Sequence, residues 1–266
     1  MIIDAAATSR CLDAIRERRP LIHNITNLVV TNTTANALLA LGASPAMVEG
    51  ADEVEEFVAK SAALVVNLGT MSADRAAAMR LAVAAARRAD VPWVLDPVAV
   101  GVMRYRSWLA RDLLTHAPAA IRGNASEILN LEGGADGMAH GVDSTAGSAA
   151  AVAAAQRLAR ATGAAVGVTG AIDYVTDGSR TIGIHNGDAM MARVTGLGCT
   201  ATAIVGACLA VEQDRFAAVA HGLAVTAVAG EIAAARAHGP GSLQLEFYDA
   251  LYRLDAATLE ERIRFG

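Results

Sequence analysis

The segment with the most specific chemistry is a glycine turn, TGLGCTA at 195–201, that runs directly into an apolar stretch. Free backbone N–H groups and the positive end of a helix dipole at such a turn bind anions. Gly196 and Gly198 would let the backbone approach a phosphate that a side chain would push away. The simpler alternative is a glycine turn that merely starts a core helix.

Two better-known nucleotide motifs do not fit this turn. Residues 196–201 match the dinucleotide fingerprint G-x-G-x-x-A, but helical sequence follows, and 216–221 lack the acid expected about 20 residues on. A P-loop is excluded because the only lysine, Lys60, has no glycines before it. Any phosphoryl transfer needs another phosphate-binding site, in which Arg122 can supply the positive charge that a P-loop lysine would provide. Taken alone, Arg122 would be an ordinary surface arginine.

Two carboxylates stand where they could hold magnesium. Asp96 ends an apolar run, and Glu127 follows Asn124 by three residues at a predicted helix start. Magnesium takes few protein carboxylates and completes its shell with substrate phosphates and water. The plainer interpretation of Glu127, which its spacing alone favours, is a capping box that bonds back to the first helical turn.

The N-terminal part is rich in Asn and Thr for so apolar a chain, with HNITN at 23–27 and TNTTAN at 31–36. We expect Asn27 to cap the helix that follows it. Met47, further along, is either core filler, the default for a single methionine, or a polarisable wall against a flat ring.

Short β-branched runs and long Ala-rich segments alternate along the chain and would position these residues. Residues 63–67, 93–96 and 165–169 predict buried strands, and 72–89 and 144–162 predict helices. The alternation indicates an α/β fold whose mostly parallel central sheet has helices on both faces. The turn DGS at 177–179 predicts an antiparallel edge hairpin of 173–176 and 180–184.

From residue 197 onward we expect helices, with Pro240-Gly241 as the one clear break before the last of them. Ligands of such folds bind beyond the carboxyl ends of the strands. Asn67, Asp96 and Thr169 should therefore share one rim of the sheet.

Composition narrows the class of protein. A chain of 266 residues that is 54% hydrophobic can bury one large core, so we expect a single domain over 1–266. The net charge of -5 without a concentrated basic patch argues against nucleic acid as a partner. The apolar stretches 197–211 and 216–230 are shorter than the ~20 residues that span a bilayer, and the N-terminus has no export pattern. We therefore expect no membrane partner. Three cysteines without paired spacing suggest neither disulfides nor zinc, which fits a reducing compartment, so we expect a cytoplasmic protein.

Taken together and in order, these segments resemble the hydroxyethylthiazole kinase family, of the ribokinase-like superfamily, over essentially the whole chain. The resemblance implies a ribokinase-like fold and transfer of the γ-phosphate of ATP to the primary hydroxyl of 4-methyl-5-(2-hydroxyethyl)thiazole in thiamine salvage. It also implies Mg2+ and a homotrimer with active sites at subunit interfaces. The matching segments are NITN at 24–27, GASP at 42–45 with Met47, DPV at 96–98, RGN at 122–124 through Glu127, VTG at 168–170 before Asp173, and TGLGC at 195–199.

The family pattern also implies a role for each matching residue. Asp96 and Glu127 would serve the magnesium, and Cys199 would meet the reacting hydroxyl. The remaining roles are thiazole contacts for Met47, Gly196 and Asn24, and ATP contacts for Arg122, Thr169 and Gly198.

Cys199 is a departure from the wider superfamily, whose sugar kinases carry an aspartate there. A thiol is a weaker proton acceptor at neutral pH unless its pKa is lowered, and we expect the helix N-terminus to lower it. A loose phosphoryl-transfer transition state needs alignment and charge neutralisation more than a strong base, so a cysteine is tolerable. Two alternatives stay open: a kinase of the same fold for another small alcohol such as hydroxymethylpyrimidine, and a non-catalytic regulator that binds the thiazole or nucleotide.

Overall fold

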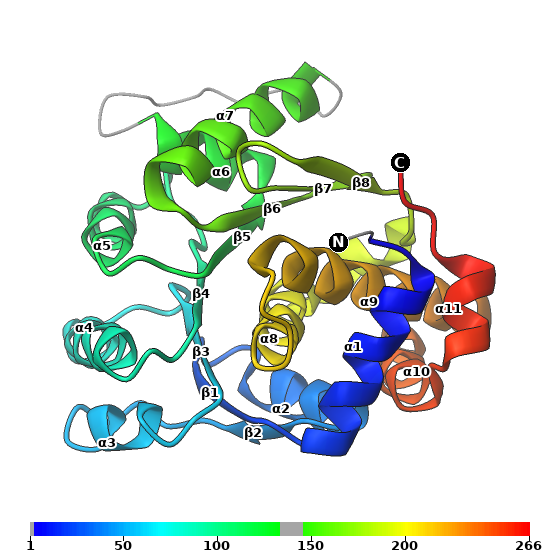
Figure 1. The fold of residues 1–266 in the computed structure, drawn as a ribbon, viewed down its shortest axis with the longest axis horizontal. Helices are drawn as coiled ribbons and strands as arrows, with labels where there is room; N and C mark the ends of the chain where they lie inside the picture. The colour runs from blue at the N-terminus through cyan, green and yellow to red at the C-terminus, as the bar shows by residue number, and fades with distance from the viewer. Residues whose placement is uncertain (1–2, 134–145) are drawn as a thin grey trace.

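The computed structural model describes residues 3–133 and 146–266 and is built on one sheet of eight strands in the order β2-β1-β3-β4-β5-β6-β7-β8 (Figure 1). Strands β1 to β6 pair in parallel, and β7 and β8 continue the sheet antiparallel at one edge. The strands are β1 (Leu21–Ile25), β2 (Ser44–Ala46), β3 (Ala63–Asn67), β4 (Trp93–Asp96), β5 (Ala120–Asn124), β6 (Ala165–Thr169), β7 (Asp173–Thr176) and β8 (Thr181–Ile184).

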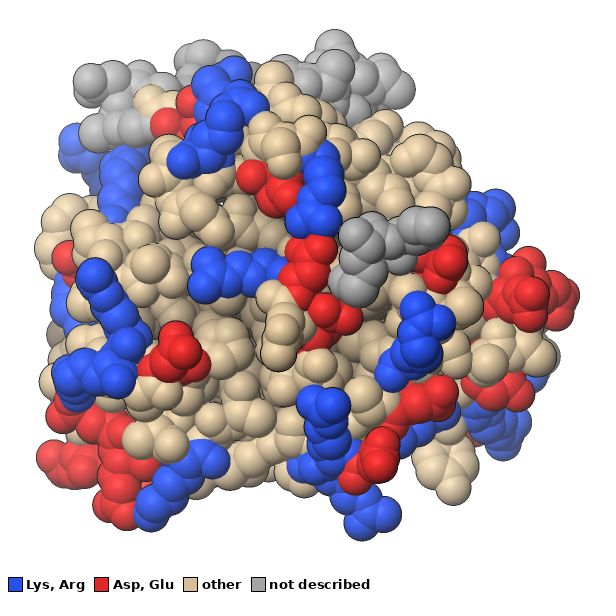
Figure 2. Space-filling model, in the orientation of Figure 1, with Lys and Arg blue, Asp and Glu red and all other residues tan. Residues whose placement is uncertain are grey.

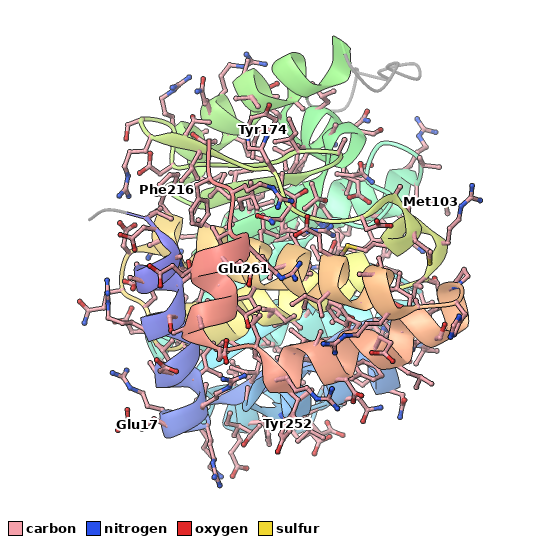
Figure 3. The ribbon with its side chains drawn as sticks, turned by 90° about the vertical axis from the view of Figure 1, so that its right-hand side faces the viewer. Glu17, Met103, Tyr174, Phe216, Tyr252 and Glu261 are labelled. Carbon is pink, nitrogen blue, oxygen red and sulfur yellow. The ribbon has the colours of Figure 1, made fainter. Side chains whose placement is uncertain are left out.

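Helices cover both faces of the sheet. One face carries α3 (Val54–Val58), α4 (Ala73–Arg88), α5 (Arg104–Leu114), α6 (Ala125–Glu132) and α7 (Ala146–Thr162) (Figure 1). The other carries α1 (Ala5–Arg18), α2 (Thr31–Leu41), α8 (Leu197–Leu209), α9 (Arg215–Arg236), α10 (Pro240–Arg253) and α11 (Ala256–Arg262), with the 3-10 turn η1 (Ala189–Arg193) before α8. Figure 3 views the molecule from this second side, with α1, α10 and α11 in front.

The strands form because their apolar side chains are buried on alternating faces. In β3, Leu64 and Val66 pack into the core under α3–α7, while Val65 packs into the core under α8 and α9. Such two-sided burial is typical of parallel strands. The same alternation decides which polar side chains at the strand ends point toward α8.

The fold class predicted from the sequence is confirmed, including the three predicted strands and the edge hairpin. The predicted helix at 72–89 is α4, capped by the side chain of Ser72. The helix predicted to open at Ser144 is described from Ala146 onward, and its expected capping residue lies outside the described residues.

The break predicted before the last helices is present, because α9 ends at Arg236 and α10 begins at Pro240, where the missing N–H of proline costs nothing. The prediction that it is the one clear break in this region was wrong. The chain also leaves the helical conformation between α8 and α9 and between α10 and α11.

Small residues bring α8 and α9 into close contact with their surroundings. A Cβ on Gly206 of α8 would lie 2.8 Å from the side chain of Val65 in β3, and one on Gly222 of α9 would lie 2.8 Å from the backbone of Val205. All but two of the 13 residues of α8 are buried. Helix α9 is long and apolar enough to cross a membrane, but 89% of its most apolar window is buried inside this fold, as in a core helix.

Acidic and basic side chains are interspersed over the face of the molecule seen in Figure 2, and no continuous basic patch covers that face. This agrees with the net charge of -5. Large apolar side chains are exposed as well, among them Leu28 and Val29 in the loop between β1 and α2, at 67% and 60%.

Candidate active site

Four polar side chains lie at the carboxyl ends of neighbouring strands and face α8. Asn67 of β3 pairs in register with Asp96 of β4. Leu95 pairs with Ile121 of β5, so Asp96 and Arg122 come next along their strands, and Thr169 ends β6. Because side chains alternate across a strand, the neighbours Val66, Leu95, Ile121 and Val168 pack on the opposite face, into the core under α3–α7. The predicted shared rim is therefore present.

The N-terminus of α8 closes this rim, and both glycines of its turn have a local structural reason. Gly196, the N-cap residue, has φ 87° and ψ -5°, a left-handed conformation that favours glycine. A Cβ there would lie 2.3 Å from the side chain of Val30. A Cβ on Gly198 would lie 2.8 Å from Nη1 of Arg122. The missing side chains thus admit Val30 on one side and a guanidinium on the other.

Arg122 brings a positive charge that the described residues do not neutralise by an ion pair. Its Nη2 donates to the hydroxyl of Thr169 at 2.6 Å, and its Nε is buried without a hydrogen-bond partner among the described residues. An arginine held by a neutral hydroxyl beside a helix N-terminus is an arrangement suited to phosphate oxygens. The expectation that Arg122, Thr169 and Gly198 lie together is met.

Asp96 is 1% exposed. Its Oδ2 accepts hydrogen bonds from Nδ2 of Asn67 at 2.7 Å and from the hydroxyl of Thr202, on α8, at 2.8 Å. Burial raises the pKa of Asp96 from 3.8 to about 6, and the nearby guanidinium of Arg122 and both hydrogen bonds oppose that rise. The carboxylate is thus held ionised against a desolvation cost.

Cys199, in the first turn of α8, is partly buried. Burial and the charge of Asp96 raise the pKa of its thiol to about 11, although amide hydrogen bonds and Arg122 act in the opposite direction. The expectation that the helix N-terminus lowers this pKa was wrong, because desolvation and a neighbouring carboxylate outweigh it. At neutral pH the side chain is a thiol.

Asn27 does not cap a helix, contrary to expectation. The N-cap of α2 is Val30, which makes no side-chain cap bond. The Nδ2 of Asn27 instead donates to Oδ1 of Asn67 at 2.9 Å and to Sγ of Cys199 at 3.4 Å. Asn27 and Thr202 are the site residues that sequence reasoning missed. Thr202 carried one available signal, since it lies one helical turn after Cys199.

Glu127 forms the capping box that its spacing predicted. Its Oε2 accepts from the backbone N–H of Asn124 at 2.9 Å, and Oδ1 of Asn124 accepts from the N–H of Glu127 at 2.9 Å. Its Oε1 accepts from the N–H of Ala99, in the loop after β4, at 3.1 Å. The carboxylate is close enough to Asp96 to raise the pKa of that residue. The cap and a place beside Asp96 are therefore compatible.

Met47 and Asn24 lie toward the other edge of the sheet. Met47 directly follows β2, is half-buried, and belongs to neither core cluster of the described residues. Asn24 of β1 is 1% exposed, and its Nδ2 donates to the carbonyl oxygens of Ile22 at 2.8 Å and Ala46 at 3.5 Å. The Nδ2 of Asn24 therefore bonds the backbone, whereas its Oδ1 is buried without a hydrogen-bond partner among the described residues.

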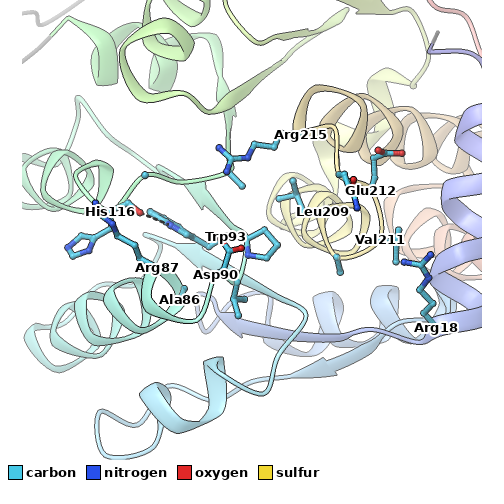
Figure 4. Close-up of a pocket in the computed structure, with 16 residues that line it drawn as sticks. Arg18, Ala86, Arg87, Asp90, Trp93, His116, Leu209, Val211, Glu212 and Arg215 are labelled. Carbon is cyan, nitrogen blue, oxygen red and sulfur yellow. Dashed lines mark hydrogen bonds between the residues drawn. The ribbon is translucent and has the colours of Figure 1, made fainter. Parts of the chain in front are cut away.

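A cavity of about 550 Å3 opens from Arg122 and Gly198 toward η1 and α9. It is lined by polar groups such as Arg122 and Thr169 and by apolar side chains such as Met191 and Leu223. A second hollow of about 510 Å3 lies at the opposite end of the sheet, beside Trp93 (Figure 4). There Arg18, Arg87 and Arg215 approach from different sides and do not converge. Of these two cavities among the described residues, the first adjoins the rim residues.

Comparison with known proteins decides the family. The model of the hydroxyethylthiazole kinase family matches residues 12–257. The chain belongs to the hydroxyethylthiazole kinase family. Membership makes it a kinase with ATP as co-substrate, which confirms the resemblance predicted from the sequence.

Relatives match over nearly the full length. A hydroxyethylthiazole kinase of Granulibacter bethesdensis is 65% identical over 96% of this chain and 92% of its own, and one of Escherichia coli O17:K52:H18 is 51% identical over 95% and 96%. A solved hydroxyethylthiazole kinase from Pyrococcus horikoshii OT3 is 38% identical, covers 97% of this chain and 98% of its own, and superposes with a TM-score of 0.90. A ribokinase-like protein of Enterococcus faecalis V583, 12% identical over 92% and 95% with a TM-score of 0.63, shares the fold, which is therefore ribokinase-like.

Proposed function

We propose that this chain, as one kinase domain, transfers the γ-phosphate of ATP to the primary hydroxyl of 4-methyl-5-(2-hydroxyethyl)thiazole, a step of thiamine salvage. The observation that carries the proposal is the arrangement at the N-terminus of α8. There the guanidinium of Arg122, which forms no ion pair with the described residues, lies against Gly198, one residue before the thiol of Cys199 and close to the carboxylate of Asp96. A phosphate-binding group and an acceptor-side group are thus adjacent.

ATP would occupy the 550 Å3 cavity with its phosphates toward Arg122, Thr169 and Gly198. The guanidinium and the free amides of the first turn of α8 would neutralise charge on the transferring group. The apolar side chains that line the cavity suit a nucleobase. Gly196, by its fixed left-handed conformation, would set the direction in which these amides point.

Magnesium fits the carboxylates of this rim. Both hydrogen bonds that Asp96 accepts from the described residues use Oδ2, which leaves Oδ1 for a cation, and Glu127, whose charge acts on Asp96, would contribute through a bound water. The described residues contain no group of three or more His, Cys, Asp or Glu side chains able to hold a metal, so phosphate oxygens and water would complete the shell. When bound, magnesium supplies charge neutralisation on the phosphates.

Cys199 would orient the acceptor hydroxyl by a hydrogen bond. Its thiol stays protonated at neutral pH, because its pKa is about 11, and one lone pair of Sγ is taken by Asn27. A loose transition state releases the hydroxyl proton late and has little need of a strong base. The expected roles of Met47 and Asn24 near the thiazole are part of the same proposal, with Met47 contacting the ring and Asn24 supporting it.

A homotrimer with interfacial sites is the proposed assembly, in the cytoplasm and without membrane or nucleic-acid partners. Leu28 and Val29 support an interface at the rim, since both are largely exposed apolar residues next to Asn27. Analytical ultracentrifugation of the purified protein would give the mass of a trimer, and a monomeric mass would refute this assembly.

The decisive experiment is ATP consumption measured with a panel of thiazole and pyrimidine alcohols. Selective turnover of the hydroxyethyl thiazole supports the proposal. Preference for hydroxymethylpyrimidine would point to a different kinase of the same fold. Tight binding of both ligands without turnover would indicate a regulator.

A further inference from the structure

Arg75 in the first turn of α4 is a buried arginine that the proposed chemistry does not use. Its side chain is 9% exposed, and its guanidinium reaches two different loops at the carboxyl rim of the sheet. Nη1 donates to Oε2 of Glu49 at 2.5 Å, and Nη2 donates to the carbonyl oxygen of Thr26. One side chain therefore connects the loop after β1 with the loop after β2.

Each of these loops carries a residue of the acceptor side. Thr26 directly precedes Asn27, whose amide donates to Sγ of Cys199 at 3.4 Å. Glu49 lies two residues after Met47. The guanidinium thus links the backbone that carries the thiol's hydrogen-bond donor to the backbone that carries Met47.

The Met47 loop has two further anchors in β1. Nδ2 of Asn24 donates to the carbonyl oxygen of Ala46 at 3.5 Å, and Nε2 of the buried His23 lies 2.7 Å from the carbonyl oxygen of Val48. A carbonyl oxygen only accepts, so His23 carries its proton on Nε2. The residues on both sides of Met47 thus have hydrogen-bonded carbonyl groups, and the ion pair of Arg75 with Glu49 fixes the same loop by a charged contact.

We propose that Arg75 is a positioning residue for the acceptor. It holds the Met47 loop at a fixed separation from Asn27 and Cys199, so that the thiazole ring binds with its hydroxyethyl hydroxyl next to the thiol. A buried guanidinium resists displacement, because breaking either contact leaves a buried charged donor unsatisfied. The inference rests on the proposed placement of Met47 against the thiazole.

The test compares Arg75→Met with Arg80→Met in the full-length protein. Arg80 lies on the same helix and also forms an ion pair, with Oδ2 of Asp112 at 2.6 Å, but contacts α5 and not the rim loops. Misplacement by about 1 Å can cost about 100-fold in an enzymatic rate. We expect Arg75→Met to raise the KM of the thiazole alcohol about tenfold or more and to change the KM of ATP less than about twofold. Arg80→Met should change neither, and Arg75→Lys should recover part of the loss.

Glu49→Gln provides a milder variant, since the Glu49 side chain is 45% exposed and Gln keeps an oxygen that can accept from Arg75 while removing the charge. It should move the acceptor KM in the same direction, and it decides the question if Arg75→Met does not fold. Equal changes in both KM values, or the same kinetics for Arg75→Met and Arg80→Met, would overturn the positioning role.

Met47→Ala separates this inference from the proposed site. If Met47→Ala raises the acceptor KM and Arg75→Met adds little in the double variant, Arg75 acts through Met47. If Met47→Ala raises it while Arg75→Met and Glu49→Gln leave it unchanged, the site stands and the role of Arg75 is rejected. An unchanged acceptor KM in Met47→Ala would reject the placement of Met47 and the inference with it.

Discussion

Replacing Asp96 by Asn should stabilise the protein while removing most of its activity. The carboxylate is fully buried, and its pKa lies at about 6 in the folded chain instead of 3.8. The folded state therefore binds more protons than the unfolded state between pH 3.8 and about 6. Stability falls as the pH rises through this window, and the full cost is present above it.

The size of the effect follows from the pKa difference, 6 minus 3.8, or about 2.2. At 1.36 kcal/mol per pKa unit the ionised carboxylate costs about 3 kcal/mol at neutral pH. Asn keeps an acceptor oxygen for Asn67 and Thr202 and carries no charge, so Asp96→Asn should gain up to that amount. For a chain of this size the gain corresponds to roughly 5–10 °C in Tm.

The assay is urea unfolding at pH 4 and pH 8 with EDTA present, followed by turnover with magnesium. We expect the Asn variant to exceed the wild type at pH 8, to lose the advantage near pH 4, and to turn over far more slowly. Glu127→Gln should lower turnover without the gain in stability, because Glu127 is half-exposed and bonds two backbone N–H groups. An Asp96→Asn protein no more stable than the wild type at pH 8, or an advantage that does not vary with pH, would refute the reasoning.

Four further changes test the other assignments. Cys199→Ala should lose at least part of its turnover while ATP binding persists, and Cys199→Asp should stay active. Cys208→Ala is the control. If the steady-state rates of Cys199→Ala match those of the wild type, the thiol has no role in the mechanism. Met47→Ala should raise the apparent binding constant of the thiazole and leave that of ATP nearly unchanged, whereas equal changes with a lower Tm would indicate plain core packing. Gly198→Ala places a Cβ 2.8 Å from a guanidinium nitrogen, so calorimetry should show ATP binding weakened more than thiazole binding, and the reverse order would contradict the proposed cradle. Burial lowers the pKa of His221 to about 4, so the unfolded state binds more protons than the folded state between pH 4 and 6.5. The free energy of unfolding should therefore fall as the pH drops through that window. A His221→Gln protein whose stability has the same pH dependence would show that another group is responsible.

The layers of the fold could be predicted from the sequence because local patterns decide them. The buried run at 63–67 and the turn at 177–179 each contain the signal for their element within a few residues. Side-chain partners across the rim carry no such signal. Asn27 looked like a helix cap by its position, yet its amide bonds Asn67 and Cys199, which are 40 and 172 residues away along the chain.

The pKa of Cys199 could not be predicted from the sequence either, because it depends on tertiary contacts. A helix N-terminus is visible in the sequence and favours a thiolate. The burial of that thiol beside Asp96 appears only once α8 packs on β4, and it raises the pKa to about 11. The capping box of Glu127 was predictable, since that motif lies within a few residues of the chain.

The close packing of α8 bears on how natural variation in this protein should be interpreted. Helix α8 is packed against neighbouring elements along its length, and contacts such as that of Gly206 with Val65 leave no room for a methyl group. A larger residue far down the helix can be accommodated only if α8 shifts, and a shift along its axis moves Gly198 and Cys199 together. Substitutions remote from the rim should therefore alter catalysis before they alter folding, and sequence distance from the site is a poor guide to which variants are neutral.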